Sequence, residues 1–261
     1  VLANKEARIA MKTLGSLLLL LIALAGCGLK FGYRHFTGPV VPTEIADDNY
    51  LVGDDHSITF VKDRLEVAML PMSAEALNRQ FAGVSEAPEG FTLPNPYAVA
   101  TNPYTYGDWT PPGEEQAPTR FTVFLVKVKN YAYPKVRLNP ANIELIAPNG
   151  RRYEALTLLA LTEYYWPYAQ AYGGNARKGF KARRDLLQRT LFADDMIFSG
   201  QEKEGYLVFP PLDRDVEEFT LWVREMVLRF DFRDAPVETV DIPYDFQREV
   251  YYARTRRADK S

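Results

Sequence analysis

Hydrophobic and polar positions alternate along much of residues 119–246, with the period of two that is typical of β-strands. The strongest segment is 121–130, whose second half alternates strictly and whose first half is apolar on both faces. The first half therefore predicts a central strand, covered on one side by a facing sheet and on the other by further structure. The same period predicts strands at 142–147, 151–156, 196–198, 205–209, 219–223, 228–232 and 237–242.

Two of these segments carry additional signals. Asn149 and Gly150 lie between 142–147 and 151–156, and an Asn-Gly step is a strong signal for a β-hairpin turn. In 228–232, Leu228, Phe230 and Phe232 alternate with charged residues, which predicts a strand with all three side chains on its buried face.

Residues 57–118 predict a β-hairpin, a short helix and a loop rich in proline and tyrosine. The hairpin strands are 58–61 and 65–69, and the helix is expected at 73–82 with Ser73 as its N-cap. Prolines interrupt nearly every element over 84–118, but the loop holds too many aromatic residues for a free linker. We expect it to lie against the core.

The hydrophobic period lengthens between the predicted strands at 151–156 and 196–198. Ala176, Phe180, Leu187 and Leu191 fall on one helical face. We expect one helix near 157–166 and another near 176–192, which together make a helical insertion over 157–192.

The order of the predicted strands resembles that of a known family. A strand ending in Lys129-Asn130, a Gly-Arg-x-Tyr hairpin at 150–153 and the segment 198–210 resemble the telokin-like, immunoglobulin-like β-sandwich found in many bacterial lipoproteins of unknown function. The resemblance covers 119–246 and implies a mainly β, immunoglobulin-like sandwich in an exported protein. It implies no catalytic residues, and the helical insertion departs from the family pattern.

Residues 11–28 form a short apolar run that ends at the only cysteine, Cys27. Lys12, an apolar stretch too short to span a bilayer and the small residues up to Gly26 together match an export signal. The segment resembles the lipobox of bacterial lipoproteins, which implies cleavage between Gly26 and Cys27 and lipidation of Cys27. A plain signal peptide and a buried helix are the alternatives.

This interpretation sets the remaining boundaries and the location. We expect a signal peptide at 1–26, with Met11 as its true start, a lipidated tether at 27–56 and a flexible basic tail at 247–261. The resemblance implies a cell-envelope protein held by its lipid. Gly28 follows the cysteine where an aspartate would resemble an inner-membrane retention signal, which favours the outer membrane.

The composition narrows the chemistry. A formal net charge of −3 argues against a nucleic-acid-binding protein, which needs a basic stripe to neutralise phosphates. Once Cys27 is lipidated, no thiol is left for a disulfide, a nucleophile or a metal site. The two histidines, His35 and His56, lack the spacing of a metal site or a catalytic triad. We expect no cofactor and no bound metal.

Acidic residues offer one further possibility for chemistry. Asp213, Asp215, Glu217 and Glu218 supply oxygen atoms suited to calcium, but they lack the spacing and the glycine of a known loop. A solvated turn is the favoured interpretation. A carboxylate-based hydrolase stays open as an alternative, because the separation of two catalytic carboxylates is spatial and the sequence singles out no pair.

Two segments of the insertion are candidate surfaces. The aromatic set is suited to a protein, a sugar or a lipid interface, or to packing within the insertion; it comprises Tyr164, Tyr165, Trp166, Tyr168 and Tyr172. The basic set is suited to an anionic membrane surface, or is a solvated helix face; it comprises Arg177, Lys178, Lys181 and Arg184.

The expected function is that of a lipid-anchored, non-catalytic interaction or structural module that binds an envelope protein through residues 161–192. The first alternative is a carbohydrate- or peptidoglycan-binding module that uses the aromatic set. The second is the carboxylate-based hydrolase.

Overall fold

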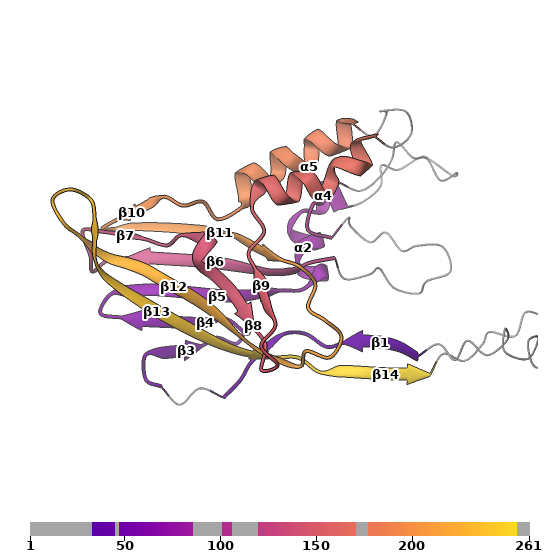
Figure 1. Cartoon of the computed structure of the whole chain (residues 1–261), viewed down its shortest axis with the longest axis horizontal. Coiled ribbons are helices and arrows are strands. Elements are labelled where there is room, and N and C mark those ends of the chain that lie inside the picture. Colours follow the sequence, from indigo (N-terminus) through magenta and orange to yellow (C-terminus); the bar gives the residue numbers. More distant parts are fainter. Residues whose placement is uncertain (1–32, 45–46, 86–100, 106–119, 171–176, 255–261) are drawn as a thin grey trace, which may run out of the picture. The chain divides into compact units, whose positions relative to one another are not determined.

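The computed structural model describes residues 33–44, 47–85, 101–105, 120–170 and 177–254. The fold is mainly β, and residues 37–250 form a compact unit built on two antiparallel sheets (Figure 1). A separate two-stranded sheet pairs β1 (Tyr33–Thr37) with β14 (Val250–Arg254).

The first sheet has five strands in the order β11-β6-β5-β4-β3. Every pairing in it is antiparallel, and the interior strand β6 pairs along its whole length with the edge strand β11. The strands are β3 (Tyr50–Val52), β4 (Ile58–Lys62), β5 (Leu65–Met72), β6 (Thr122–Asn130) and β11 (Gln201–Phe209).

The second sheet has seven strands and is organised around β12, which pairs along one edge with β13 and along the other with β8 and β7. The β8–β9 hairpin turns at Gly150, whose φ of 83° is readily adopted only by glycine, as the Asn-Gly step predicts. The strands are β2 (Val41–Pro42), β7 (Lys135–Arg137), β8 (Ile143–Ile146), β9 (Arg152–Glu154), β10 (Met196–Phe198), β12 (Glu218–Phe230) and β13 (Pro236–Gln247).

The inner faces of the two sheets share one hydrophobic core, so the fold is a β-sandwich. Phe124 of β6 packs edge-on against Phe219 of β12, and its ring centre lies 5.2 Å from that of Phe246 of β13. One polar contact also crosses the core, because the buried Tyr244 hydroxyl donates a hydrogen bond of 2.9 Å to the carbonyl oxygen of Val67.

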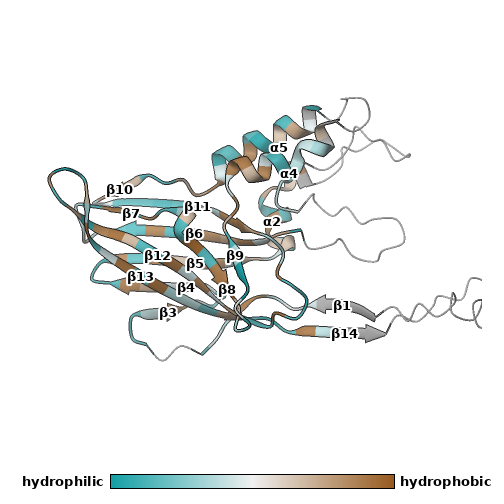
Figure 2. Cartoon of the chain, viewed as in Figure 1, coloured by the Kyte–Doolittle hydropathy of each residue, from teal (hydrophilic) through white to brown (hydrophobic). Residues whose placement is uncertain are grey.

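The outer face of the five-stranded sheet carries a second hydrophobic core under three helices, α2 (Ala74–Gln80), α4 (Leu158–Gln170) and α5 (Arg177–Thr190). β6 contributes Phe124 and Val126 to the inner core, whereas Val123 and Leu125 face the helices. Its first half is hydrophobic throughout and alternation begins in its second half (Figure 2). The prediction of a central strand covered on both sides is confirmed.

The sandwich has two distinct ends. Gly38 donates a hydrogen bond to the Glu249 carbonyl, and β2 pairs with the last residues of β13, so the chain enters and leaves residues 37–250 at one end, the entry end. The turn 231–235 precedes the first residue of β13. A strand of 12 residues extends about 40 Å, which places this turn at the opposite, distal end (Figure 1).

Several element boundaries differ from the expectations. Residues 41–42 and 50–52, expected in the tether, are strands β2 and β3 of the two sheets; with two and three residues they are too short to show a period of two. The hairpin at 58–72 belongs to the five-stranded sheet rather than preceding the sandwich. The short helix α3 (Ala82–Ser85) and the 3-10 turn Pro140–Asn142 complete the elements of this part of the chain.

The predicted strands 219–223 and 228–232 form one strand, β12, which ends at Phe230 rather than at residue 232. β12 contains register shifts after Val223 and around Arg229, and Glu225 has a positive φ of 52°. Leu228 is buried and Phe230 is half-buried, but Phe232 lies beyond the strand and is 88% exposed. Phe232 is therefore a turn residue, and its predicted place on the buried face is wrong.

Candidate functional site

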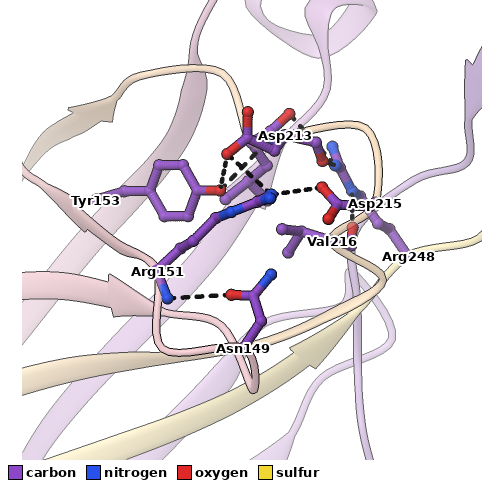
Figure 3. Close-up of polar contacts among 8 residues, drawn as sticks. Asn149, Arg151, Tyr153, Asp213, Asp215, Val216 and Arg248 are labelled. Atoms are coloured by element: carbon purple, nitrogen blue, oxygen red, sulfur yellow. Dashed lines mark hydrogen bonds and ion pairs between the residues drawn. The ribbon is translucent and has the colours of Figure 1, made fainter.

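The acidic segment at 213–215 is held by a network of polar contacts (Figure 3). Arg151 extends from the β8–β9 hairpin to Asp215, at 2.5 Å, and to Asp213, at 3.2 Å. Tyr153 of β9 donates a hydrogen bond of 2.8 Å to Asp213. The sequence brings these groups together because the Asn149-Gly150 turn places Arg151 and Tyr153 one strand pair away from the segment that leads into β12.

Arg248 holds the same segment through hydrogen bonds to its main chain. Its side chain is buried and donates hydrogen bonds to the carbonyl oxygens of Val216, at 2.8 Å, and Asp213, at 2.6 Å. These carbonyl oxygens are shielded from water, and the buried guanidinium supplies the hydrogen-bond donors that they would otherwise lack.

This geometry gives the acidic segment a structural role. The hydrogen bond from Arg151 lowers the pKa of Asp215, so its carboxylate stays ionised and is a poor general acid at neutral pH. Arg151 also occupies the position between the two carboxylates that a calcium ion would need. Among the described residues, no group of three or more His, Cys, Asp or Glu side chains is arranged to hold a metal.

The aromatic set divides between core and surface. Tyr165 is only 1% exposed, lies in the second core and donates its hydroxyl to the Pro103 carbonyl. The guanidinium of Arg183, also buried, lies 5.4 Å from the centre of the Tyr165 ring. Tyr165 therefore secures α4 to the molecule and is out of reach of a partner.

Tyr164 and Trp166 are exposed, but they do not form one platform. Residues two apart on a helix project about 200° from each other. Trp166 packs edge-on against Phe180 of α5, whereas Tyr164 packs against Phe121 beside β6. A flat stacking surface for a sugar ring is therefore not formed by these two. Tyr168 lies in α4 and Tyr172 lies outside the described residues.

The basic set lies on α5. Arg177, Lys181 and Arg184 are exposed and follow the spacing i, i+4 and i+7, which places them along one flank of the helix. Lys178 lies in the first turn of the same helix. The spacing and the helix were both visible in the sequence.

A third surface lies outside the segments that the sequence pattern indicates. Exposed hydrophobic side chains come from three segments at the distal end of the sandwich, namely Tyr131, Phe198, Phe232 and Val237. Hydrogen bonds join two of these segments: Gly200 donates to the Asn130 carbonyl, and Ser199 donates to that of Pro134. The Lys135–Asp234 ion pair joins the third segment to them. We call this set the distal surface.

Side chains at the base of the distal surface are fixed by contacts among themselves. The Lys135 ammonium lies 4.9 Å from the centre of the Phe230 ring and pairs with Asp234. Arg233 lies over the exposed Phe232 ring, 5.0 Å from its centre. A phenylalanine that follows a charged residue near a turn was the only signal of this surface in the sequence.

A cavity of about 1070 Å³ lies at the entry end between the start of β6, the end of β5 and α2. His56, at a turn with a φ of 67°, contributes to its wall together with Asp55 and Arg248. His35 lies in β1. Residues 106–119 connect Thr105 and Arg120 of this wall in the sequence and, like residues 86–100, lie outside the described residues. Because most of the proline-rich loop is in these two segments, we assign no ligand to the cavity.

The predicted signal peptide, Gly26 and Cys27 lie outside the described residues, as does most of the predicted tail. Within the described residues, no helix is both long and apolar enough to cross a membrane.

Comparisons of the chain with protein-family models, with curated proteins and with solved structures found no match. The function is therefore argued from the chemistry of the surfaces described above.

Proposed function

We propose that the protein is a lipid-anchored, non-catalytic interaction module of the cell envelope. Cys27 is its lipidated residue, cleavage follows Gly26, and the outer membrane is the favoured location. Its partner is an envelope protein that binds the distal surface.

The observation that carries the proposal is the position and composition of the distal surface. Phe232 is 88% exposed at the tip of the β12–β13 hairpin, and Phe198 and Val237 are exposed nearby. Exposed apolar side chains gathered in one region mark interaction sites, and aromatic residues and arginine are enriched in protein interfaces. Because the chain enters the sandwich at the other end, an N-terminal lipid leaves this surface accessible.

The proposed non-catalytic role is supported by the ion pairs that the carboxylates of the acidic segment form. Asp213 and Asp215 are paired with Arg151, and the lowered pKa of Asp215 does not suit proton transfer near neutral pH. The burial of Tyr165 and the divergent positions of Tyr164 and Trp166 likewise weaken the case for a sugar-binding platform.

The finer assignment of the sandwich as immunoglobulin-like is also a proposal. Its support is the packing of two antiparallel sheets around one core and the sequence resemblance over 119–246. An experimental structure whose strand connections differ from those of immunoglobulin-like domains would refute it.

A photo-crosslinking amino acid at position 232 tests the partner. In native membranes it should yield one recurrent protein adduct, and the same crosslinking amino acid at position 51, where Leu51 is also exposed on the edge strand β3, should not. Replacing Phe198 and Val237 by Ser should weaken co-purification of that protein at least about tenfold. Equal labelling from positions 232 and 51 would contradict the proposal.

The anchor is tested separately through Cys27. Cys27→Ser should abolish labelling of the protein by a radioactive fatty acid and release it from membranes. Continued acyl labelling of this variant would refute the anchor.

A further inference from the structure

We propose that the outer side of α4 and α5 docks on the anionic phospholipid headgroups of the leaflet that holds the lipid anchor. This inference rests on the proposed lipidation of Cys27, and it assigns a second contact to the protein, separate from the distal surface.

The first argument is charge complementarity. Residues 158–190 contain six basic and two acidic residues, although the chain as a whole carries a net charge of −3. Within the described part of the chain, no ion pair involves Arg177 or Lys181, and the carboxylate nearest to Arg184 is that of Asp185, at 3.9 Å. The flank of α5 therefore carries positive charge that the described residues leave largely unneutralised.

The second argument is the kind of apolar side chain beside this flank. Trp166 of α4 is 50% exposed and its ring meets Phe180 of α5, so it lies where the two helices join. Leu159, two helical turns before Trp166 on the same face of α4, is also exposed. Tryptophan and tyrosine are enriched at the level of lipid headgroups, and basic residues beside them add attraction to anionic lipids.

The third argument is reach. α4 packs on Phe121, and Phe121 lines the same cavity as Gly38 and Val40 at the entry end. The chain from Cys27 to Gly38 extends at most about 40 Å. A lipid on Cys27 therefore keeps the entry end close to the bilayer, and the helices are attached at this end.

The lipid anchor also explains how a surface with only a few basic residues can orient the protein on the membrane. Each basic residue near an anionic leaflet favours binding by about fivefold, which is too little for a free domain with a few such residues. An anchor turns this contact into an intramolecular one, so the same residues set the orientation of a protein that is already held.

The test uses the lipidated, full-length protein in vesicles of phosphatidylcholine alone or of equimolar phosphatidylcholine and phosphatidylglycerol. Since Cys27 is the only cysteine, an introduced cysteine is the only free thiol to which a spin label can attach. Gln188→Cys places the label on the basic flank, one further turn along α5 from Arg184, and Ser199→Cys places it at the distal end as the matched control.

In anionic vesicles, collisions of the label at position 188 with a water-soluble nickel complex should fall at least about fivefold relative to neutral vesicles. High salt should reverse the fall because it screens the attraction. The combined variant Arg177→Gln, Lys181→Gln, Arg184→Gln should abolish it, and the Lys versions of both arginines should retain it. The label at position 199 should not change.

The outcomes separate this inference from the proposed function. If the protein does not float with the vesicles, the anchor itself is refuted. If it floats and the label at 188 is equally accessible in both vesicles, the docking inference alone is overturned. A photo-crosslinker at position 166 that yields a protein adduct instead of a lipid adduct would assign the surface to a protein partner, which also overturns it.

Discussion

The hydroxyl of Tyr244 and the carbonyl oxygen of Val67 form a hydrogen bond between the two sheets, through the middle of the apolar core. Burial raises the pKa of Tyr244 well above its ordinary value, so this phenol stays neutral and remains a donor. The contact fixes β13 over β5 at one position, which apolar packing alone does not do.

Removing this hydroxyl tests its contribution. Tyr244→Phe should lower the free energy of unfolding by about 1 kcal/mol, because a buried acceptor loses its donor while the ring packing stays. Urea unfolding followed by circular dichroism measures it. Tyr131→Phe, which removes an exposed hydroxyl bonded to Glu202, is the control and should have a smaller effect. Equal effects would show that the contact across the core adds nothing specific.

The buried guanidinium of Arg248 should be far more important. Arg248→Met keeps the apolar stem but leaves the carbonyl oxygens of Val216 and Asp213 without their charged donor. We expect a loss of about 3 kcal/mol in urea unfolding. The exposed Arg152, paired with Glu144, is the matched case, and Arg152→Met should cost below about 1 kcal/mol. A loss at Arg248 as small as that at Arg152 would contradict the assigned role.

Removing the adjacent rings of Tyr165 and Trp166 on α4 should lower the stability of the protein by different amounts. Tyr165→Ala should destabilise the protein by about 4 kcal/mol, because it empties a buried position in the second core. Trp166→Ala should cost about 1 kcal/mol, since its ring is half exposed. Thermal unfolding of both variants makes the comparison. A larger loss for Trp166→Ala would reverse the assignment of core and surface.

The raised pKa of a buried tyrosine predicts how the stability of the fold changes at alkaline pH. Burial raises the pKa of Tyr206 to about 12, whereas an unfolded tyrosine titrates near its ordinary value of 10. The unfolded state therefore loses its proton first, and stability should fall as pH rises from about 10 to about 12, by up to about 1.4 kcal/mol per pH unit for each such group. The urea midpoint measured across this range reports the fall.

Tyr206→Phe should flatten that dependence. Among the described residues the Tyr206 hydroxyl has no hydrogen-bond partner, so the variant should not be less stable at neutral pH. Tyr164→Phe, at a partly exposed tyrosine of the same layer, serves for comparison. An unchanged alkaline slope in Tyr206→Phe would show that another group causes the loss.

The elements that the sequence predicted well are those with strong local signals. The apolar first half of 121–130 predicted cover on both faces of β6, Asn149-Gly150 predicted the β8–β9 turn, and Ser73 accepts the expected capping hydrogen bond from Ala76. β2 and β3 were missed because they have only two and three residues, which leaves no local period, and β2 forms only by pairing with the distant strand β13.

The surfaces depended on details that a pattern does not contain. A helical period indicates that one side of α4 is buried, but an error of one residue exchanges Tyr165 for Trp166. The bulges in β12 shift its register, so the alternation that placed Phe232 inside does not persist to the turn. In α5, Arg183 belongs to the buried face although its charged neighbours are exposed.

The two-sided burial of β6 also constrains how the sequence can change. Val123 and Leu125, together with Tyr206 and Val208 of β11, are apolar because α4 and α5 cover them. A relative of this sandwich that lacked the helices would need polar residues at these four positions to stay monomeric in water. The helical segment and one face of two strands therefore have to be gained or lost together in evolution, as a single heritable unit.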